Sequence, residues 1–373
     1  MSTITTPALV CHGLNKPLVL EDVMLDEMRP DEAIVEIEAS GVCHTDLSCT
    51  DGTIPAGFPN VFGHEGAGTV LQNGPLLTHI KPGDKVLLSF NHCGNCTNCK
   101  SSHPAYCATW APLNFSGKRL DGSATLYDPN SAAPMYGTFF GQSSFMRRAL
   151  VSGASIVKVP QETDLPLFAA LGCGFQTGAG CVLNTLRVTR DNSLVVFGVG
   201  AVGMAGVMAG VMAGATTIIA VDLNEGRLAL AKELGATHVI DGKSEDVDGQ
   251  IKKICEPANG AQFAMDGTGV PRVIETMVKC LGTKGRGATV GAPKPGSTVA
   301  IDIFQHLIMG REYVGSTEGD VDAKTFIPFL IEEHAKGRFP IDKLISYYDI
   351  KDYQTAFQDM KATKVIKPVL LWK

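Results

Sequence analysis

The chain has 373 residues, of which 45% are hydrophobic and 19% charged, and its formal net charge is −6. This length favours two domains, each long enough to bury a core, in a soluble globular protein. The charges form no basic stripe, which argues against nucleic acid as a partner. The apolar runs are broken by glycine and fall short of a membrane-spanning helix, and Met1–Pro7 has no pattern of a secretion signal, so we expect a cytoplasmic protein.

Short strands with turns between them dominate the first half. Residues 33–38 alternate apolar and polar side chains, as a half-buried strand does. Residues 68–71 and 84–90 also have the pattern of strands, and Pro82-Gly83 marks a turn before the latter. No long helical period appears before about Leu165, so this half is predicted to be a β-rich domain of barrel or sandwich type.

The second half alternates strands and helices. Residues 193–197 form an apolar run typical of a strand buried on both faces of a parallel sheet. Further elements are predicted in the order helix 202–213, strand 217–221, helix 225–234 closed by Gly235, and strands 238–240, 264–266 and 287–291. This alternation indicates a doubly wound parallel sheet, so the fold class is α/β. The tail from about Tyr313 ends in a strand over 368–372 and is expected to pack on the first domain.

Four cysteines lie close together in a polar stretch, in the pattern C-x2-C-x2-C-x7-C. Four thiolates with this spacing can surround one tetrahedral zinc ion and leave no open position. Disulfides or free buried thiols are the alternatives, but disulfides suit small secreted domains rather than a chain of this length. We therefore predict a structural zinc lobe over residues 91–108, with these ligands: Cys93, Cys96, Cys99 and Cys107.

A glycine pattern G-x-G-x-x-G directly follows the apolar run at 193–197 and opens the next helix. In such a loop Gly198 permits a tight turn, Gly200 lets the backbone approach a pyrophosphate, and Gly203 lets helix and strand pack closely. Asp222 ends the following strand, where a carboxylate binds the ribose hydroxyls of NAD and disfavours the 2′-phosphate of NADP, although Arg227 lies nearby. The alternative is a strand–turn–helix whose glycines are incidental.

Three further segments contain metal-ligand residue types: Cys43-His44-Thr45-Asp46, Gly63-His64-Glu65-Gly66-Ala67-Gly68 and Gly172-Cys173-Gly174. With the cysteine lobe, the glycine loop and Asp222, they occur in the order found in the zinc-dependent alcohol dehydrogenases of the medium-chain dehydrogenase/reductase family, which the chain resembles over nearly its whole length. Residues 172–180 and 139–145 look most like those of the benzyl (aryl) alcohol dehydrogenases.

The resemblance implies a GroES-like catalytic domain over 1–173 and 314–373 and a Rossmann domain over 174–313. It implies two zinc ions per chain and NAD, with roles residue by residue. Cys43, His64 and Cys173 would bind the catalytic zinc, with Asp46 holding His64 and Glu65 behind the ion. The remaining implied contacts are Thr45 with the alcohol oxygen, Thr177 and Val202 with the nicotinamide, His44 and Lys367 with the pyrophosphate, and Phe90, Phe139 and Phe140 with the substrate.

One position departs from the family pattern. Many members have a histidine five residues after the first zinc-ligand cysteine, where it relays the alcohol proton to solvent, and this chain has Ser48 there. A serine hydroxyl can pass a proton along but is not a base near neutral pH. The relay therefore ends at water or at His44.

The leading hypothesis is hydride transfer between NAD and a primary, aromatic alcohol or its aldehyde. A carbonyl reductase acting on a larger metabolite with NAD(P)H is the alternative, and a catalytically silent nucleotide- or zinc-binding relative is a third. The expected partner is a small molecule rather than a nucleic acid or a membrane. The resemblance also suggests a homodimer or homotetramer, with a contact around residues 299–303 at the edge of the nucleotide sheet.

Overall fold

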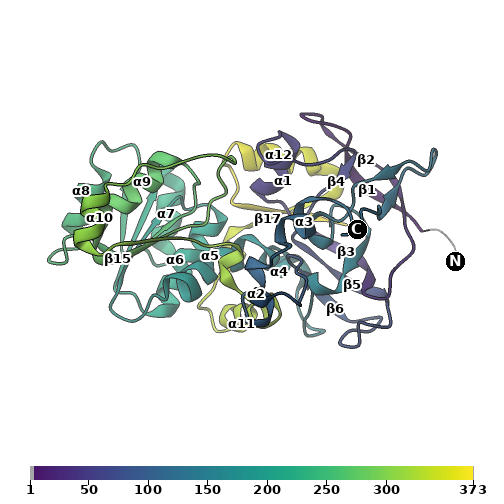
Figure 1. Cartoon of the computed structure of the whole chain (residues 1–373), viewed down its shortest axis with the longest axis horizontal. Helices are drawn as coiled ribbons and strands as arrows, with labels where there is room; N and C mark the ends of the chain where they lie inside the picture. Colours follow the sequence, from purple (N-terminus) through teal and green to yellow (C-terminus); the bar gives the residue numbers. More distant parts are fainter. Residues whose placement is uncertain (1–3, 373) are drawn as a thin grey trace. The chain divides into compact units, whose positions relative to one another are not determined.

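The structure is a computed structural model that describes residues 4–372 (Figure 1). The chain forms two compact units. Unit 1 holds the chain up to Cys173, then Asp322–Ile331 and the segment from Asp342 onward, and unit 2 holds Gly174–Val321 and Glu332–Ile341. The domain division predicted from the sequence has the same break after residue 173 but returns to the first domain at 314. Residues 1–3 of the segment inspected for a secretion signal lie outside the described range.

Unit 1 is rich in strands. They are β1 (Thr5–Cys11), β2 (Leu18–Leu25), β3 (Glu32–Gly41), β4 (Asn60–Val61), β5 (Gly66–Asn73), β6 (Lys85–Leu88), β7 (Leu126–Tyr127), β8 (Pro134–Met135), β9 (Arg148–Ser152), β10 (Ile156–Lys158), β17 (Ile345–Asp349) and β18 (Lys367–Leu371). One sheet has the order β10-β6-β5-β3-β18-β17, with β9 also paired to β3, and the other has the order β4-β1-β2-β7-β8. The last strand of the chain thus joins the sheet of the first half, as the sequence predicts.

The helices of unit 1 are short, which explains why the sequence shows no long helical period there. They are α1 (His44–Thr50), α2 (Thr97–Lys100), α3 (Trp110–Phe115), α4 (Leu165–Phe168) and α12 (Tyr353–Lys361), while α11 (Ala323–Ala335) begins in unit 1 and ends in unit 2. Short 3-10 turns include Phe139–Gly141 and Ala169–Gly172.

Strand β3 is more deeply buried than its alternating sequence predicts. Most of its residues are buried on both faces, and only Glu36 and Glu38 are half-exposed. The strand is central because β5, β9 and β18 all pair with it. The two half-exposed side chains also have polar partners, since Glu38 accepts a hydrogen bond from the Thr69 hydroxyl at 2.9 Å and Glu36 pairs with Arg147 at 3.4 Å.

Unit 2 is built on a parallel sheet. Its strands are β11 (Ser193–Phe197), β12 (Thr217–Asp222), β13 (His238–Asp241), β14 (Ala261–Asp266), β15 (Leu281–Thr289) and β16 (Glu312–Gly315). Its helices are α5 (Gly174–Gly180), α6 (Ala201–Ala213), α7 (Glu225–Glu233), α8 (Val247–Ile254), α9 (Pro271–Cys280) and α10 (Ile303–Met309), with a π-helical turn over Cys181–Leu186. The strand order is β13-β12-β11-β14-β15-β16, so the chain adds strands first on one side of β11 and then on the other. Parallel sheets of this kind bind dinucleotides at the point where the order of connection reverses.

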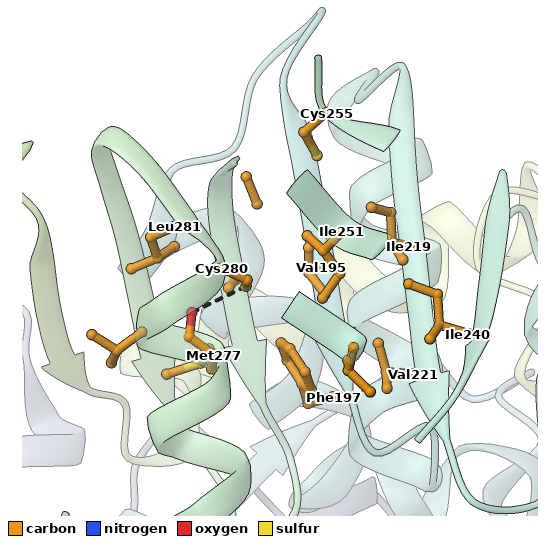
Figure 2. Close-up of a cluster of buried hydrophobic side chains, with 14 of the residues drawn as sticks. Val195, Phe197, Ile219, Val221, Ile240, Ile251, Cys255, Met277, Cys280 and Leu281 are labelled. Carbon is orange, nitrogen blue, oxygen red and sulfur yellow. Dashed lines mark hydrogen bonds between the residues drawn. The ribbon is translucent and has the colours of Figure 1, made fainter. Parts of the chain in front are cut away.

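The core of unit 2 packs apolar strand residues against α8 and α9 (Figure 2). Val195, Phe197 and Ile219 come from adjacent strands, whereas Ile251 and Met277 come from the two helices. The continuous apolar runs of β11 and β12 are needed because these strands are covered on both faces. The predicted doubly wound sheet is therefore confirmed.

Two expectations for unit 2 differ from the structure. The strand expected over 287–291 begins already at Leu281, because the glycine-rich stretch from there onward pairs with β14. Residues 299–303, expected at the edge of the sheet, form no strand, since 299–302 are irregular and Ile303 begins α10, and β16 occupies that edge instead.

Within residues 4–372 no single helix has the length and apolar character needed to cross a membrane. Only the bent pair Leu165–Gly172 and Gly174–Leu186 reaches that length and composition when its two members are taken together.

Candidate metal and nucleotide sites

A cluster of potential metal ligands lies in unit 1. Cys43, His64, Glu65 and Cys173 each offer a ligand atom, and these atoms lie within 4.8 Å of one another. The residues come from three distant segments: Cys43 from the residue before α1, His64 and Glu65 from the residues before β5, and Cys173 from the residue after a 3-10 turn. The structure thus brings together the three ligands that the family resemblance implies.

The start of helix α1 fixes two of these ligands together. Cys43 precedes the helix, and Asp46, in its first turn, accepts a hydrogen bond from the Cys43 N–H at 2.9 Å. The other oxygen of Asp46 accepts from Gly63 N–H at 3.1 Å and lies 2.9 Å from His64 Nδ1. Both Asp46 and His64 are buried. A carboxylate on one imidazole nitrogen leaves the other nitrogen as a lone-pair donor for a metal, the usual arrangement around zinc.

The cluster fits a zinc ion chemically. His64 Nε2 is buried and has no hydrogen-bond partner among the described residues, so it is available as a ligand. Hydrogen bonding with Cys173 holds the pKa of the Cys43 thiol well below its usual range, although burial opposes this. Burial alone would lower the pKa of His64, but the Asp46 carboxylate outweighs burial and raises it. Thiolate and imidazole ligands with one open position suit a catalytic zinc.

Glu65 and Lys367 form a buried ion pair beside this cluster. Lys367 Nζ donates to both carboxylate oxygens of Glu65 at 2.8 Å and to the carbonyl of Val42 at 3.2 Å. These contacts use all three N–H groups of the ammonium, and the lysine is almost wholly buried. Sequence reasoning missed this pair, because no local pattern connects residues so far apart. The pyrophosphate contact implied for Lys367 stays a prediction, as does that of His44, which is exposed on α1.

The four-cysteine lobe has the geometry of a closed site. Its sulfur atoms lie within 4.8 Å of one another, with Cys96 and Cys99 Sγ 3.5 Å apart and Cys93 and Cys99 Sγ 3.9 Å apart. A tetrahedron with Zn–S bonds of about 2.3 Å has S···S edges of about 3.8 Å. Hydrogen bonding from the Ala108 N–H lowers the pKa of Cys96 to about 6, which favours the thiolate. The lobe therefore fits a structural zinc ion.

The glycine loop of unit 2 has the expected shape. Gly198, at the end of β11, has a φ of +80°, which a residue with a side chain rarely adopts. A Cβ on Gly203 would lie 2.0 Å from the Gly198 carbonyl oxygen, so helix α6 packs tightly on the turn. A Cβ on Gly200 would meet no atom within 4 Å, so this glycine faces open space, as a backbone that approaches a ligand requires. Val202 is half-buried in the first turn of α6.

Asp222 lies at the end of β12, next to this loop. Its oxygens accept hydrogen bonds from Val199 N–H at 2.8 Å and Asn224 N–H at 2.9 Å. Each carboxylate oxygen can accept a further bond, so Asp222 retains the capacity to bind ribose hydroxyls. These features fit a dinucleotide.

Thr177 belongs to α5 and is buried. Its hydroxyl donates to the buried carboxylate of Glu318 at 3.2 Å, as does the side-chain amide of Gln176. Glu318 therefore orients the side chain of Thr177, the residue that the family resemblance places in contact with the nicotinamide. The sequence offered no signal for it, since it lies far along the chain in an irregular segment.

Aromatic rings surround the imidazole of His64. Phe140 stacks on it with ring centroids 4.5 Å apart, and Phe139 contacts it edge-on at 5.3 Å. Trp110 and Phe115 pack in turn against Phe140. All three phenylalanines expected near the substrate, Phe90, Phe139 and Phe140, are almost wholly buried, and Phe139 and Phe140 form an apolar wall beside His64. Their contact with a substrate stays a prediction.

Comparison with known protein families gives two matches. Residues 29–161 match the alcohol dehydrogenase GroES-like domain, and residues 201–332 match the zinc-binding dehydrogenase family. The first range lies in the β-rich unit with the metal-ligand clusters, and the second covers most of the parallel sheet.

Individual relatives match almost the entire chain. The geraniol dehydrogenase of Castellaniella defragrans is 39% identical over 99% of this chain and 98% of its own. The crystal structure of benzyl alcohol dehydrogenase from Acinetobacter calcoaceticus has a TM-score of 0.95 at 38% identity, covering 99% of this chain and 100% of that one. An alcohol dehydrogenase zinc-binding domain protein from Burkholderia ambifaria has a TM-score of 0.96 at 42% identity, with both chains fully covered.

The chain therefore belongs to the zinc-dependent alcohol dehydrogenases of the medium-chain dehydrogenase/reductase family. It is an oxidoreductase that uses zinc and a nicotinamide dinucleotide. The family, fold class and enzyme class predicted from the sequence are confirmed.

Proposed function

We propose that the enzyme interconverts a primary alcohol and its aldehyde with NAD, and that the alcohol carries its hydroxymethyl group on an unsaturated carbon. The observation that carries this proposal is the convergence of Cys43, His64 and Cys173 beside a wall of aromatic rings. One relative is named for geraniol and another for benzyl alcohol. Both alcohols have an sp2 carbon next to the carbinol carbon, and flat unsaturated groups pack favourably on aromatic rings.

Each group of the chain has a defined task in this reaction. When bound, zinc lowers the pKa of the alcohol and the nicotinamide accepts its hydride. Cys43, His64 and Cys173 would hold the ion, and a set of three protein ligands would leave one position for the alcohol oxygen. The Thr45 hydroxyl, 3.7 Å from Cys43 Sγ, accepts the proton of the alcohol as a hydrogen bond. Ser48 lies one turn further along the same side of α1 and can pass that proton on without acting as a base.

The choice of NAD rests on Asp222. Its carboxylate would repel a 2′-phosphate, and Leu223 and Asn224 supply no cation to compensate. We expect Asp222→Gly to weaken NADH binding while leaving NADPH binding equal or tighter, measured by cofactor fluorescence titration. Unchanged NADH affinity would contradict the assignment of Asp222 to the ribose.

The substrate class is tested with matched pairs of alcohols. Benzyl alcohol is compared with cyclohexylmethanol, and geraniol with its fully saturated analogue, each with NAD and with NADP. We expect kcat/KM to favour the unsaturated member of each pair by about tenfold or more, which corresponds to roughly 1.4 kcal/mol. Equal values within both pairs would contradict the proposal. Activity only toward a large carbonyl compound with NADPH would support the reductase alternative.

We also propose that the enzyme forms a homodimer through unit 2. Helix α10 carries four large apolar side chains that are mostly exposed, with Ile303 81% and Leu307 72% exposed. An apolar helix face of this kind marks an interface, and the predicted contact at 299–303 is continuous with it. Leu307→Asp should convert the assembly to monomers in light scattering. A parent protein that is already monomeric at micromolar concentration would contradict the proposal.

A cytoplasmic location is proposed on the state of the thiols. All eleven cysteines are free in the described structure, and six of them lie in the two ligand clusters. Free thiols of this number suit a reducing compartment.

A further inference from the structure

Gln142 is a wholly buried amide whose side chain makes three hydrogen bonds to main-chain groups near the catalytic ligands. Its Oε1 accepts from Gly66 N–H at 3.0 Å, and its Nε2 donates to the His64 carbonyl at 2.9 Å and to the Ser89 carbonyl at 3.0 Å. Because Gly66 supplies a donor and the other two groups are acceptors, the orientation of the amide is unambiguous. Gln142 thus connects the His64 segment with the residue that follows strand β6.

Ser89 extends this connection to the third ligand. Its hydroxyl donates to the carbonyl of Gly172 at 2.8 Å, and Gly172 directly precedes Cys173. A Cβ on Gly172 would lie 2.0 Å from the Leu88 carbonyl oxygen, so the backbone before Cys173 rests directly on the end of β6. Ser89 is buried, which shields both hydrogen bonds from water.

The three ligands are therefore linked in two steps. Asp46 bonds to Cys43 and His64, as described above. Gln142 and Ser89 link His64 to Cys173 through the chain of contacts from the His64 carbonyl to the Gly172 carbonyl.

The backbone around Gln142 is unusual. Phe140 and Ser143 have φ values of +51° and +47°, and Gly141 between them has +68°. Residues other than glycine avoid this region, and such positions persist where the surrounding structure imposes them, commonly at functional sites. Here the bends place the Gln142 amide between the two carbonyl groups and the Phe140 ring on His64.

We propose that Gln142 and Ser89 are positioning residues that fix the Cys173 thiolate relative to His64 and thereby set the geometry and affinity of the catalytic zinc site. The proposal rests on the zinc site of the proposed function. Groups that hold ligands in place commonly change metal affinity about 10- to 100-fold when they are removed.

The test compares two variants with a matched control. Gln142→Leu removes the amide, and Ser89→Ala removes the single hydroxyl. The control is Asn114→Leu, since Asn114 is also a wholly buried amide with three main-chain hydrogen bonds, to Asn91 N–H, the Asn91 carbonyl and the Trp110 carbonyl. Those contacts lie beside the cysteine lobe and reach none of the segments that carry the catalytic ligands.

The readouts are metal binding and spectroscopy rather than turnover. The full-length protein is loaded with Co²⁺, and Cys173→Ser identifies which absorption bands belong to the catalytic ion. We expect Gln142→Leu and Ser89→Ala to shift those bands and to raise the catalytic-site Kd for zinc, measured by chelator competition, about 10- to 100-fold. The double variant should differ little from Gln142→Leu alone, because both residues belong to one chain of contacts. Asn114→Leu should keep the catalytic bands and Kd of the parent.

Catalytic bands and a Kd within twofold of the parent in both variants would overturn the proposal, even if their thermal stability falls. If Gln142→Leu fails to fold, the Co²⁺ bands and the zinc Kd of Ser89→Ala alone test the proposal. This variant is expected to fold because it removes only one oxygen atom. If Cys173→Ser leaves every absorption band and the number of bound metal ions unchanged, the zinc site of the proposed function is refuted, and this inference fails as well.

Discussion

Removing the cation from the buried Glu65–Lys367 pair is the most direct test of the electrostatics of unit 1. Lys367 Nζ lies 2.8 Å from both carboxylate oxygens, and the two side chains are 3% and 0% exposed. The variant Lys367→Met keeps most of the volume of the side chain and leaves Glu65 buried without its counter-charge. Water cannot replace the lost hydrogen bonds, because neither residue reaches the surface.

The expected effect is large. Leaving one partner of a buried ion pair uncompensated costs about 3–5 kcal/mol of folding free energy. At roughly 2 °C per kcal/mol for a large domain, the melting temperature should fall by about 6–10 °C. Glu65 can lessen the cost by taking up a proton, since burial already raises the pKa of this carboxyl even with Lys367 present.

The assay is thermal unfolding followed by circular dichroism, with zinc in excess so that metal loss does not differ between variants. Glu65→Gln combined with Lys367→Met should recover most of the lost stability, because no charge then remains buried. Lys364→Met is the control, since this lysine pairs with Asp359 at the surface and is 69% exposed, and its loss should change the melting temperature little.

A fall of less than about 1 kcal/mol in Lys367→Met, or a double variant no more stable than the single one, would refute the reasoning. The same variant also tests the pyrophosphate contact implied for Lys367 by the family resemblance. All three N–H groups of Lys367 already donate hydrogen bonds within unit 1. We therefore expect the Kd for NADH to change little in Lys367→Met, although the variant is less stable.

Three further predictions concern the lobe, the proton path and acid stability. Cys99→Ser should reduce the zinc content from two ions per chain to one and lower the melting temperature; elemental analysis that still finds two would refute the lobe assignment. Ser48→His should add an ionisation near pH 6.5 to the pH–rate profile of alcohol oxidation, and a profile identical to the parent's would contradict the relay argument. Hydrogen bonds from Arg338 lower the pKa of Glu333, so its contribution to stability is present above about pH 4.3 and is lost as the pH falls through its folded-state pKa. Urea unfolding should therefore show Glu333→Gln less stable than the parent at pH 7, with a difference that shrinks as the pH falls from about 4.3 through the folded-state pKa, and a difference that stays constant on acidification would exclude this cause.

The sequence predicted the parallel sheet of unit 2 well because its signals are local. The run Ser193–Phe197 is a strand with those same bounds, and Gly235 ends its helix with a φ of +112°. Local signals also identified the cysteine lobe, since all its ligands fall in one loop. The extended start of β15 was missed because a stretch rich in glycine and charge has no strand pattern and is held in place by pairing with β14.

The catalytic cluster could not be derived from spacing. Cys43, His64 and Cys173 lie far apart in the sequence, and only the resemblance to a family connected them before the fold was known. The contacts of Gln142 and Lys367 went unrecognised for the same reason, because each is made across a long stretch of chain. A polar residue in the mainly aromatic and small segment Phe139–Phe145 is nevertheless a signal of a buried hydrogen bond, and Gln142 provides it.

The two sets of metal ligands differ in how far apart their residues lie in the sequence, and this difference affects when each set can bind zinc. The four thiols of the lobe need only a short loop to close, whereas the catalytic ligands require most of unit 1 to fold first. Closing a longer loop costs more chain entropy, by about 0.6 kcal/mol for each doubling of its length. The lobe can therefore capture zinc during or soon after synthesis, while the catalytic ion can enter only a unit that is already folded.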